Sequence, residues 1–242
     1  MIEIKNLNVK YAQQDILNDI NLNMKDGEII AVIGPSGCGK STLLNVLSGL
    51  NKNYSGTVLI NGKKPSPKEQ IIGFIPQNYG LLPWLTVKKN ITLGLEIKNK
   101  AISLPMKLLE DLGLTDLLNR YPNELSGGQK QRVSLARTFA LKADLLLMDE
   151  PFSALDAITR EEMQDVFLHL WQFQQVSAVF VTHYVEEALY LGKKIVVMTN
   201  SPSTIYKIID NPLFGDKNFR QKEEFAVLSK ALRDYLKKAG KK

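Results

Sequence analysis

Apolar residues in the first part of the chain follow strand spacing and then helix spacing. IEIKNLNV alternates apolar and polar residues, which indicates a strand with one buried face. EIIAVIG is a continuous apolar run that ends at Gly34, and it indicates a strand in a sheet covered on both faces. After Lys40 the apolar spacing becomes that of a helix. The residues with this spacing are Leu43, Leu44, Val46, Leu47 and Leu50. Two more strands are predicted at TVLINGK, which contains an Asn61-Gly62 turn, and at IIGFIPQ.

The middle of the chain has a different pattern from the segments on either side of it. Between about Pro83 and Lys142 the segments SLPMKLLEDLGL and TDLLNRY are interpreted as helical, with Pro and Gly between them. Three apolar strands follow, in ADLLLMDEP, SAVFVTH and KKIVVM, and they alternate with the helical stretches TREEMQDVFLHLWQF and VEEALYL. This alternation predicts a parallel sheet with helices on its faces, interrupted by a helical insertion. A helical tail at about 212–242 ends in the amphipathic segment KEEFAVLSKALRDYLKK.

Composition and charge exclude several classes of protein. The 242 residues suit one large domain, or a core with a small subdomain. No apolar run approaches the roughly 18 residues of a membrane span, and the N-terminus lacks the apolar region of a signal peptide. We therefore expect a cytoplasmic chain, unless something holds it to a membrane from outside. The net charge of +6 comes largely from the C-terminal residues, so a solvated tail is favoured and no nucleic acid partner is expected.

The segment GPSGCGKST, residues 34–42 and here called the P-loop, fits the phosphate-binding pattern G-x-x-x-x-G-K-[ST] without a mismatch. It lies between a predicted strand and a predicted helix, as that pattern requires. Because its glycines lack a Cβ, the backbone N–H groups can surround phosphate oxygens. The positive end of the following helix points at the same oxygens. The alternative is a glycine turn with a chance lysine. The predicted nucleotide-binding residues of the loop are Gly34, Ser36, Gly37, Cys38, Gly39, Lys40, Ser41 and Thr42.

The single cysteine, Cys38, lies inside the P-loop and excludes both an internal disulfide framework and a cysteine-based zinc site. No catalytic base accompanies it, so we interpret it as a small filler. As a hypothesis, we expect a thiol-reactive reagent to block nucleotide binding and bound ATP to protect the thiol.

Several polar residues directly follow apolar strands, where ligands of parallel sheets gather. Asp149 and Glu150 end LLLMDE; the first is expected to hold Mg²⁺ and the second to orient or deprotonate an attacking water. His183 would contact the γ-phosphate and that water, and Gln77 would contact Mg²⁺ and water. Tyr11 would stack on adenine. The simpler interpretations are strand-end caps for the polar residues and cover of a sheet edge for Tyr11. The predicted Mg²⁺ ligands are Ser41, Gln77 and Asp149.

Taken together, these residues resemble ABC-transporter ATP-binding subunits over at least Met1 to about Ile205. The segments that carry the resemblance are the P-loop, Gln77, LSGGQ at Leu125–Gln129 (the signature segment), LLLMDEP, SALD at Ser153–Asp156, and His183. The signature segment discriminates best, because other P-loop NTPases lack it. The resemblance implies a single ABC domain over 1–242. Its fold would be an α/β P-loop NTPase core with a parallel sheet, an antiparallel β-subdomain, and an inserted α-helical subdomain at about 83–142.

The resemblance also implies why the chain has two glycine segments suited to phosphate. In this family two subunits face each other head to tail, as a homodimer or with a related subunit. ATP held by the P-loop of one copy is contacted by the signature segment of the other, and Asp156 helps to join the two sites. From the residues themselves, Ser126 can cap a helix whose first amides, at Gly127 and Gly128, face an anion. The partner-site residues implied are Ser126, Gly127, Gly128 and Gln129.

The segment after Gln77 narrows the resemblance further. NYGLLPWLTVKKNITLGLE resembles the nitrate/sulfonate/taurine importer group, and DAITRE after SALD agrees. The apolar run Leu81–Leu85 suits a groove for a short helix of a membrane subunit, or else forms a satellite core under the helical subdomain. The implied function is ATP hydrolysis that drives import of small anionic or polar solutes by dimer closure. The implied partners are permease subunits at Gln77–Leu85 and an extracytoplasmic solute-binding protein, which places the chain at the cytoplasmic face of the membrane.

Three rival functions stay open at this stage. One is the ATP-binding subunit of another transporter class, such as a split exporter. A second is a soluble ABC ATPase outside transport, although such proteins generally have two cassettes or zinc cysteines. A third is an idle ATP-binding scaffold, which Lys40, Asp149, Glu150 and His183 disfavour. The sequence departs from the family at Tyr184, where an acidic residue is usual, so weaker capping of the helix VEEALYL is expected.

Overall fold

The computed structural model describes residues 1–100 and 104–241. Within it the chain forms two compact units, one of Met1–Gln70 with Ser177–Lys242 and one of Ile71–Val176. Residues 101–103, inside the predicted helical subdomain, and Lys242, at the end of the predicted tail, lie outside the described residues. Among the described residues, no helix combines the length and the apolar character that a membrane crossing needs.

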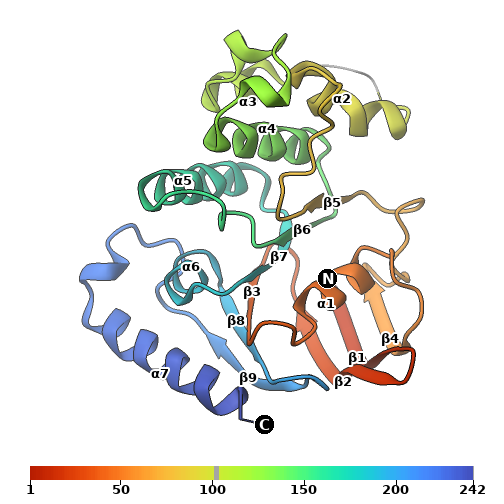
Figure 1. Cartoon of the computed structure of the whole chain (residues 1–242), viewed down its shortest axis with the longest axis vertical. Coiled ribbons are helices and arrows are strands. Elements are labelled where there is room, and N and C mark those ends of the chain that lie inside the picture. Colours follow the sequence, from red (N-terminus) through yellow and green to blue (C-terminus); the bar gives the residue numbers. More distant parts are fainter. Residues whose placement is uncertain (101–103, 242) are drawn as a thin grey trace. The chain divides into compact units, whose positions relative to one another are not determined.

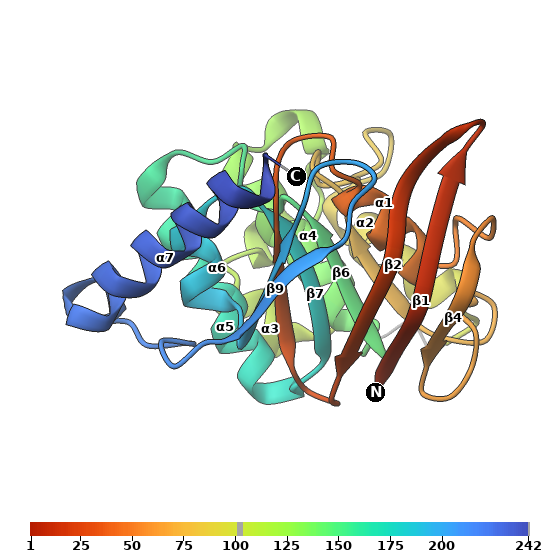
Figure 2. The same cartoon turned by 90° about the horizontal axis from the view of Figure 1, so that it is seen from below.

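The first unit contains a three-stranded antiparallel sheet in the order β2-β1-β4, which Figure 2 shows side by side. Its strands are β1 (Ile2–Tyr11), β2 (Gln14–Met24) and β4 (Ser55–Ile60). The alternation predicted at the N-terminus is confirmed, because Ile2 and Ile4 are buried while Lys5 is exposed. Residues Asn61 and Gly62 follow β4 with φ angles of 51° and 77°, the two left-handed positions of a hairpin turn.

The first unit also contains a set of strands with β3 (Ile29–Ile33) between β7 (Ser177–Thr182) and β8 (Lys194–Met198), all parallel. Every residue of β3 and β7 is buried, as the continuous apolar runs predict. The strand β9 (Ile205–Asp210) pairs antiparallel with β8. The helical elements of this unit are α1 (Lys40–Leu47), α6 (Val185–Leu191), η3 (Phe219–Gln221) and α7 (Glu223–Ala239). The amphipathic α7 packs on α6, β8 and β9 and buries Leu232.

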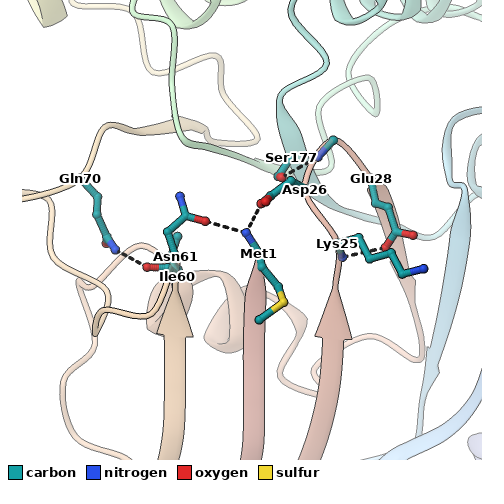
Figure 3. Close-up of polar contacts among 9 residues, drawn as sticks. Met1, Lys25, Asp26, Glu28, Ile60, Asn61, Gln70 and Ser177 are labelled. Carbon is teal, nitrogen blue, oxygen red and sulfur yellow. Dashed lines mark hydrogen bonds and ion pairs between the residues drawn. The ribbon is translucent and has the colours of Figure 1, made fainter.

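Polar contacts close the end of the first unit at which β3 begins (Figure 3). Gln70 Nε2 donates to the Ile60 carbonyl at 2.8 Å, and Gly27 N–H donates to Ser177 Oγ at 3.1 Å. Glu28 accepts from the Lys25 amide at 2.9 Å and from Lys194 Nζ at 3.1 Å. Burial favours a raised pKa for Glu28, but these two donors outweigh it and hold the pKa below its ordinary value. The amino ends of β3, β7 and β8 are thus occupied by structural contacts, which leaves their carboxyl ends for ligands.

The second unit pairs β5 (Ile72–Ile75) with β6 (Leu145–Asp149) in parallel. Its helices are α2 (Val87–Ile97), α3 (Met106–Asp111), α4 (Gly127–Ala140) and α5 (Ala157–Gln174). The helices α2 and α3 lie against α4 (Figure 1). An aromatic cluster fills the centre of this unit, in which the rings of Phe139 and Phe152 meet that of Phe167 edge-on at centroid distances of 6.1 and 6.4 Å.

The interpretation of TDLLNRY as a helix is wrong. That segment forms only a short 3₁₀ turn, η1 (Thr115–Leu117), and a second one, η2 (Pro122–Glu124), follows it. Two of the carbonyls that a longer helix would use internally, those of Leu118 and Arg120, instead accept the amides of Lys88 and Val87 at the start of α2. Tertiary hydrogen bonds therefore override the local helical pattern.

Candidate functional site

The P-loop connects β3 to α1 and depends on bare glycines. Gly37 and Gly39 have φ angles of 76° and 96°, in the left-handed region that glycine adopts without strain. A Cβ on Gly39 would lie 2.8 Å from Leu17 Cδ2, and a Cβ on Gly34 would lie 3.0 Å from the Met198 carbonyl oxygen. Ser36 and Gly37 at the tip are exposed. The loop thus presents backbone N–H groups to solvent while its base is closely packed.

The side chain of Lys40 lies inside the P-loop and is only 7% exposed. Its Nζ donates to the carbonyls of Gly34 at 2.9 Å and Pro35 at 2.8 Å. These two bonds fix the ammonium at the centre of the loop, where it can also meet phosphate oxygens. Ser41 is exposed at the start of α1, and Thr42 is half-buried beside it.

The Cys38 thiol is part of the packed base of the P-loop. It is 1% exposed, and its Sγ lies 3.9 Å from Lys40 Nζ. Burial raises the pKa of the thiol. A shielded thiol with little thiolate reacts slowly, and the hypothesis that a thiol-reactive reagent blocks nucleotide binding stays a prediction. The filler interpretation agrees with this burial.

His183 and the P-loop leave neighbouring strands at the same end. Ile33 of β3 is paired with Thr182 of β7, so Gly34 and His183 are the next residues of two adjacent parallel strands. His183 is exposed, and its ring lies 4.0 Å from the ring of Tyr184. The register thus brings the predicted histidine to the same strand end as the phosphate-binding loop.

The N-terminus of α6 is supported although Tyr184 stands where the family usually has an acidic residue. Tyr184 is the N-cap and makes no side-chain cap bond, as expected from the missing carboxylate. Its N–H instead donates to Thr182 Oγ1 at 3.0 Å, and that hydroxyl donates to Glu187 Oε2 at 2.7 Å. Glu186 and Glu187 also place negative charge in the first turn, where the helix dipole favours it.

Tyr11 lies at the end of β1 with 47% of its surface exposed. Its Oη accepts from Asn51 Nδ2 at 3.2 Å. An exposed ring whose hydroxyl is fixed at one edge leaves a face open for stacking, so the geometry agrees with the proposed adenine contact and with cover of the sheet edge alike.

Gln77, Asp149 and Glu150 meet at the carboxyl ends of β5 and β6 in the second unit. Gln77 Nε2 lies 3.3 Å from Glu150 Oε2. Glu150 has a φ angle of 47°, a left-handed conformation that is uncommon for a side chain with Cβ. Its carbonyl accepts both the N–H of Ser153, at 3.2 Å, and the Ser153 hydroxyl, at 2.9 Å. Backbone strain that neighbours hold in place is a common feature of functional sites.

The signature segment is the capped start of α4. Ser126 Oγ accepts from the Gln129 N–H at 3.3 Å, and Gln129 Oε1 accepts from the Ser126 N–H at 2.9 Å. This reciprocal pair forms the capping box, so the predicted N-cap is confirmed. Ser126 and Gly127 are exposed, whereas Gly128 is half-buried. The first amides of α4 therefore face outward with the positive end of the helix dipole behind them.

Asp156 caps the neighbouring helix α5. Its Oδ1 accepts from the Thr159 N–H at 3.0 Å, and this hydrogen bond holds the pKa of Asp156 below its ordinary value. Thr159 in turn touches the signature segment, since a Cβ added to Gly128 would lie 3.0 Å from Thr159 Cγ2. The second unit thus gathers the signature segment and the turn at Asp156.

The predicted apolar run Leu81–Leu85 is only partly exposed. Trp84 is 69% exposed and Pro83 is exposed, whereas the three leucines are half-buried. The buried Asn90 of α2 holds this segment: its Oδ1 accepts from the Leu82 N–H at 2.8 Å, and its Nδ2 donates to the Leu85 carbonyl at 2.9 Å. The leucines pack and the tryptophan protrudes, so the satellite-core interpretation fits the leucines, and the groove for a membrane subunit stays a prediction.

Sequence reasoning missed Arg137, which lies on α4 and is bonded to the turn after Gln77. Its two Nη atoms donate to the carbonyls of Tyr79 and Gly80. An arginine within the apolar segment RVSLARTFA was the available signal, because a charged group at such a position needs partners.

The predicted Mg²⁺ ligands suit that ion by their chemistry. Ser41, Gln77 and Asp149 offer a hydroxyl, an amide oxygen and a carboxylate, which are the hard oxygen donors that Mg²⁺ prefers. Within the described residues, no group of three or more His, Cys, Asp or Glu side chains could hold a metal. One carboxylate with neutral oxygens fits an ion that keeps waters and binds substrate phosphates.

Known proteins share these features. The family model described as "ABC transporter" matches residues 17–153. The aliphatic sulfonates import ATP-binding protein SsuB of Bacillus thuringiensis subsp. konkukian (strain 97-27) is 41% identical over 224 residues, which cover 91% of this chain and 88% of that protein. SsuB of Bacillus subtilis (strain 168) is 39% identical over 223 residues, covering 92% and 88%.

A solved structure agrees with the sequence relatives. It is described as a dimeric, post-hydrolysis state of the ATP-binding cassette MJ0796 bound to ADP and Pi. It matches with a TM-score of 0.76 and 32% identity, and the match covers 87% of this chain and 98% of the MJ0796 chain. The expected fold class, a P-loop NTPase core, is thereby confirmed. This chain belongs to the ABC transporter family, in which it is an ATP-binding and ATP-hydrolysing subunit.

Proposed function

We propose that this subunit energises an importer of small anionic or polar solutes, with sulfonates as the first class to test, by ATP-driven closure of a dimer. The import function and the solute class are supported by the names of relatives that are 39% and 41% identical to this chain. The structural observation that carries the dimer mechanism is the exposed, capped start of α4 at Ser126 and Gly127.

In this proposal the P-loop binds the triphosphate of ATP. Its backbone amides and Lys40 hold the phosphates, Ser41 and Thr42 lie at the start of α1, and Tyr11 stacks on the adenine. Each charge interaction with a helix N-terminus contributes about 0.3–1 kcal/mol at the surface and up to ~2 kcal/mol when partly buried. Mg²⁺, when bound by Ser41, Gln77 and Asp149, would neutralise developing charge on the phosphates.

Glu150 is the proposed general base, since its carboxylate is held beside Gln77 and its backbone is fixed by Ser153. It would orient or deprotonate the attacking water, a role that typically contributes about 10²–10⁴-fold in rate. Gln77 and His183 would orient the same water and the γ-phosphate. Each has a side chain of the right hydrogen-bonding type at the end of a strand.

The signature segment would serve the ATP of a partner copy. The amides in the first turn of a helix have no intrahelical partner, and those of Gly127 and Gly128 lack a covering Cβ. Ser126 and Gln129 satisfy each other, so the capping box holds the helix start in shape for an anion. Asp156, on the adjacent turn, would join the two sites. The similar MJ0796 structures are described as dimeric.

A permease would bind at Gln77–Leu85, and the whole complex would include an extracytoplasmic solute-binding protein. The exposed Trp84 supports this, because a large apolar side chain that protrudes from a held segment suits a partner helix. The chain would then lie at the cytoplasmic face of the membrane, held there by that permease.

Four measurements test the proposal. The unaltered chain should show Mg²⁺-dependent ATPase activity, which phosphate release measures. The Glu150→Gln chain should dimerise when ATP is added, which light scattering after size exclusion measures. Deletion of the gene should abolish growth on an aliphatic sulfonate as sole sulfur source, and Trp84→Ala should weaken co-purification of the permease. Normal sulfonate uptake in the deletion strain would reject the solute class, and export of a solute would favour the split-exporter alternative.

A further inference from the structure

We propose that Arg137 is a positioning residue that fixes the turn after Gln77 to helix α4, and so ties the Gln77–Glu150 pair to the glycines of the signature segment. This inference rests on the proposed function of the signature segment in dimer closure. It concerns the second unit alone, in which the turn, α4 and Glu150 all lie.

The turn has a backbone that needs support. Tyr79 and Gly80 both have a φ of 61°, so two consecutive residues are left-handed and one of them carries a Cβ. The Tyr79 N–H donates to the Pro76 carbonyl at 3.0 Å, and the Gly80 N–H donates to the Asn78 carbonyl at 2.6 Å. These local bonds close the turn but do not attach it to the rest of the unit. A conformation of this kind persists when surrounding contacts determine it.

Helix α4 supplies those contacts. Arg137 Nη1 donates to the Gly80 carbonyl at 2.6 Å, and Nη2 donates to the Tyr79 carbonyl at 2.8 Å. Ser134 Oγ donates to the same Tyr79 carbonyl at 3.0 Å. Arg137 is half-buried, and this burial lowers the pKa of its guanidinium. A planar fork with two donors in fixed relation holds two carbonyls more rigidly than the single ammonium of a lysine would.

Glycine at position 80 belongs to the same arrangement. A Cβ there would lie 2.8 Å from Pro76 Cγ and 3.3 Å from Arg137 Nη2. A side chain there would clash with the Pro76 ring, would crowd the guanidinium, and would be strained at this positive φ. The close approach of backbone and guanidinium requires both the bare glycine and the long, flat side chain.

Tyr79 also extends from the turn to the other end of α4. Its hydroxyl lies 3.4 Å from the position of a Cβ on Gly127, the first residue of the helix. Arg137 is ten residues further along, which is about 15 Å at the helical rise of ~1.5 Å per residue. Tyr79 is thus anchored through its carbonyl by Ser134 and Arg137 and touches the signature segment through its phenol. A shift of the turn would be passed to the residue whose amide is proposed to meet the partner's ATP.

The turn is connected to the proposed catalytic base at its other side. Gln77 Nε2 lies 3.3 Å from Glu150 Oε2, and Gln77 precedes Tyr79 and Gly80 by two and three positions. The bonds from Arg137 to Tyr79 and Gly80, here called the clamp, therefore hold Gln77 in a fixed position relative to the start of α4. Loosening it should leave the P-loop unchanged, since the P-loop belongs to the first unit. What it should weaken is closure of the dimer around ATP.

The test uses the full chain in the Glu150→Gln background, where ATP is held and dimers accumulate. Arg137→Met keeps the length and apolar stem of the side chain and removes both bonds. We expect ATP affinity of the monomer to stay within about twofold and the dimer dissociation constant to rise about tenfold or more, the range for losing a hydrogen bond to a charged group. The readouts are fluorescent-ATP titration and sedimentation velocity.

The matched control is Arg132→Met on the same helix. Arg132 Nη1 donates to the Leu112 carbonyl at 3.4 Å and does not contact the turn. We expect its dimer constant to stay within about threefold of the parent, as for a weak, partly exposed bond. Equal losses in both variants, or an unchanged dimer constant in folded Arg137→Met, would overturn the inference.

Two further measurements keep the result interpretable. If Arg137→Met does not fold, Arg137→Lys, which keeps the charge without the fork, should still weaken the dimer, and full dimerisation in that variant would reject the clamp. Hydrogen exchange at the Tyr79 and Gly80 amides should accelerate in either variant while P-loop amides stay unchanged. If the Glu150→Gln parent never dimerises, the proposed function fails, and these exchange rates alone decide whether Arg137 holds the turn.

Discussion

The P-loop and the signature segment both present glycine amides at the start of a helix, yet they are built differently. The P-loop contains its own cation, Lys40, held by two loop carbonyls, and its glycines adopt left-handed conformations around a packed base. The signature segment contains a capped, exposed helix start at Ser126 and, unlike the P-loop, contains no lysine or arginine. In the proposed function the first holds the triphosphate with its own amides and its own cation. In the same proposal the second adds only weak contacts to a phosphate that a partner copy already holds.

The largest expected effect comes from Glu150→Gln, which separates binding from hydrolysis. The amide cannot accept a proton from the attacking water, so kcat for ATP should fall by about 10²–10⁴-fold. ATP affinity at the P-loop should persist, and ATP should then shift the chain toward a dimer. Phosphate-release kinetics measure kcat, and light scattering measures dimerisation. A variant that hydrolyses ATP at the parental rate would contradict the assignment of the base.

Lys40→Ala tests whether the P-loop of a single subunit needs its own cation to bind ATP. Removing the ammonium should weaken ATP binding to the monomer by about 10–100-fold, since hydrogen bonds to charged groups contribute about 1.5–3 kcal/mol. Fluorescent-ATP titration of the monomer is the measurement. If affinity is unchanged, the loop amides alone hold the triphosphate and the comparison with the signature segment loses its basis.

Ser126→Ala should show the opposite behaviour. Loss of an N-cap costs about 1 kcal/mol, which corresponds to roughly fivefold in an equilibrium constant. In the Glu150→Gln background, we expect this loss in the dimer dissociation constant and none in ATP affinity of the monomer. A matched control is Thr86→Ala, which removes the N-cap of α2 outside the signature segment. An equal change in monomer affinity for both variants would show a general loss of fold instead.

The smallest effect concerns pH and the Asp156 cap. Its folded pKa lies below the ordinary value of 3.8, so the cap stabilises the fold above that pH and loses its contribution as pH falls through the folded pKa. Asn also caps helices and does not titrate. The drop in Tm between about pH 6 and about pH 3 should therefore be smaller in Asp156→Asn than in the parent. An identical drop in both chains would place the acid sensitivity elsewhere.

Much of the fold follows from local patterns, and the exceptions have particular causes. The buried strands β3, β6, β7 and β8 lie where continuous apolar runs predict them. The strand β2 gave no clear signal because Asp19, with a φ of 49°, interrupts its register with β1, so Leu17 and Ile20 do not alternate. β9 was missed because it is the mostly exposed edge of the set and carries no apolar run.

The same distinction holds for the candidate site. Residues with a fixed spacing in one segment, such as the P-loop and the Ser126–Gln129 capping box, can be named from the sequence. For Arg137 the sequence shows only an arginine in an apolar segment and not its partners at Tyr79 and Gly80, which precede it by more than fifty positions. A bond between distant segments becomes visible only when the fold brings the partners together.

The bare Cα of Gly39 has one more consequence. Because Ile16 and Leu17 of β2 lie directly against it, the wall behind the P-loop belongs to the antiparallel sheet and not to the loop itself. The side-chain volume at these two positions would therefore influence nucleotide affinity, although neither residue is proposed to touch the phosphates. A change of side-chain size at Ile16 or Leu17 would then alter nucleotide affinity without touching the nucleotide.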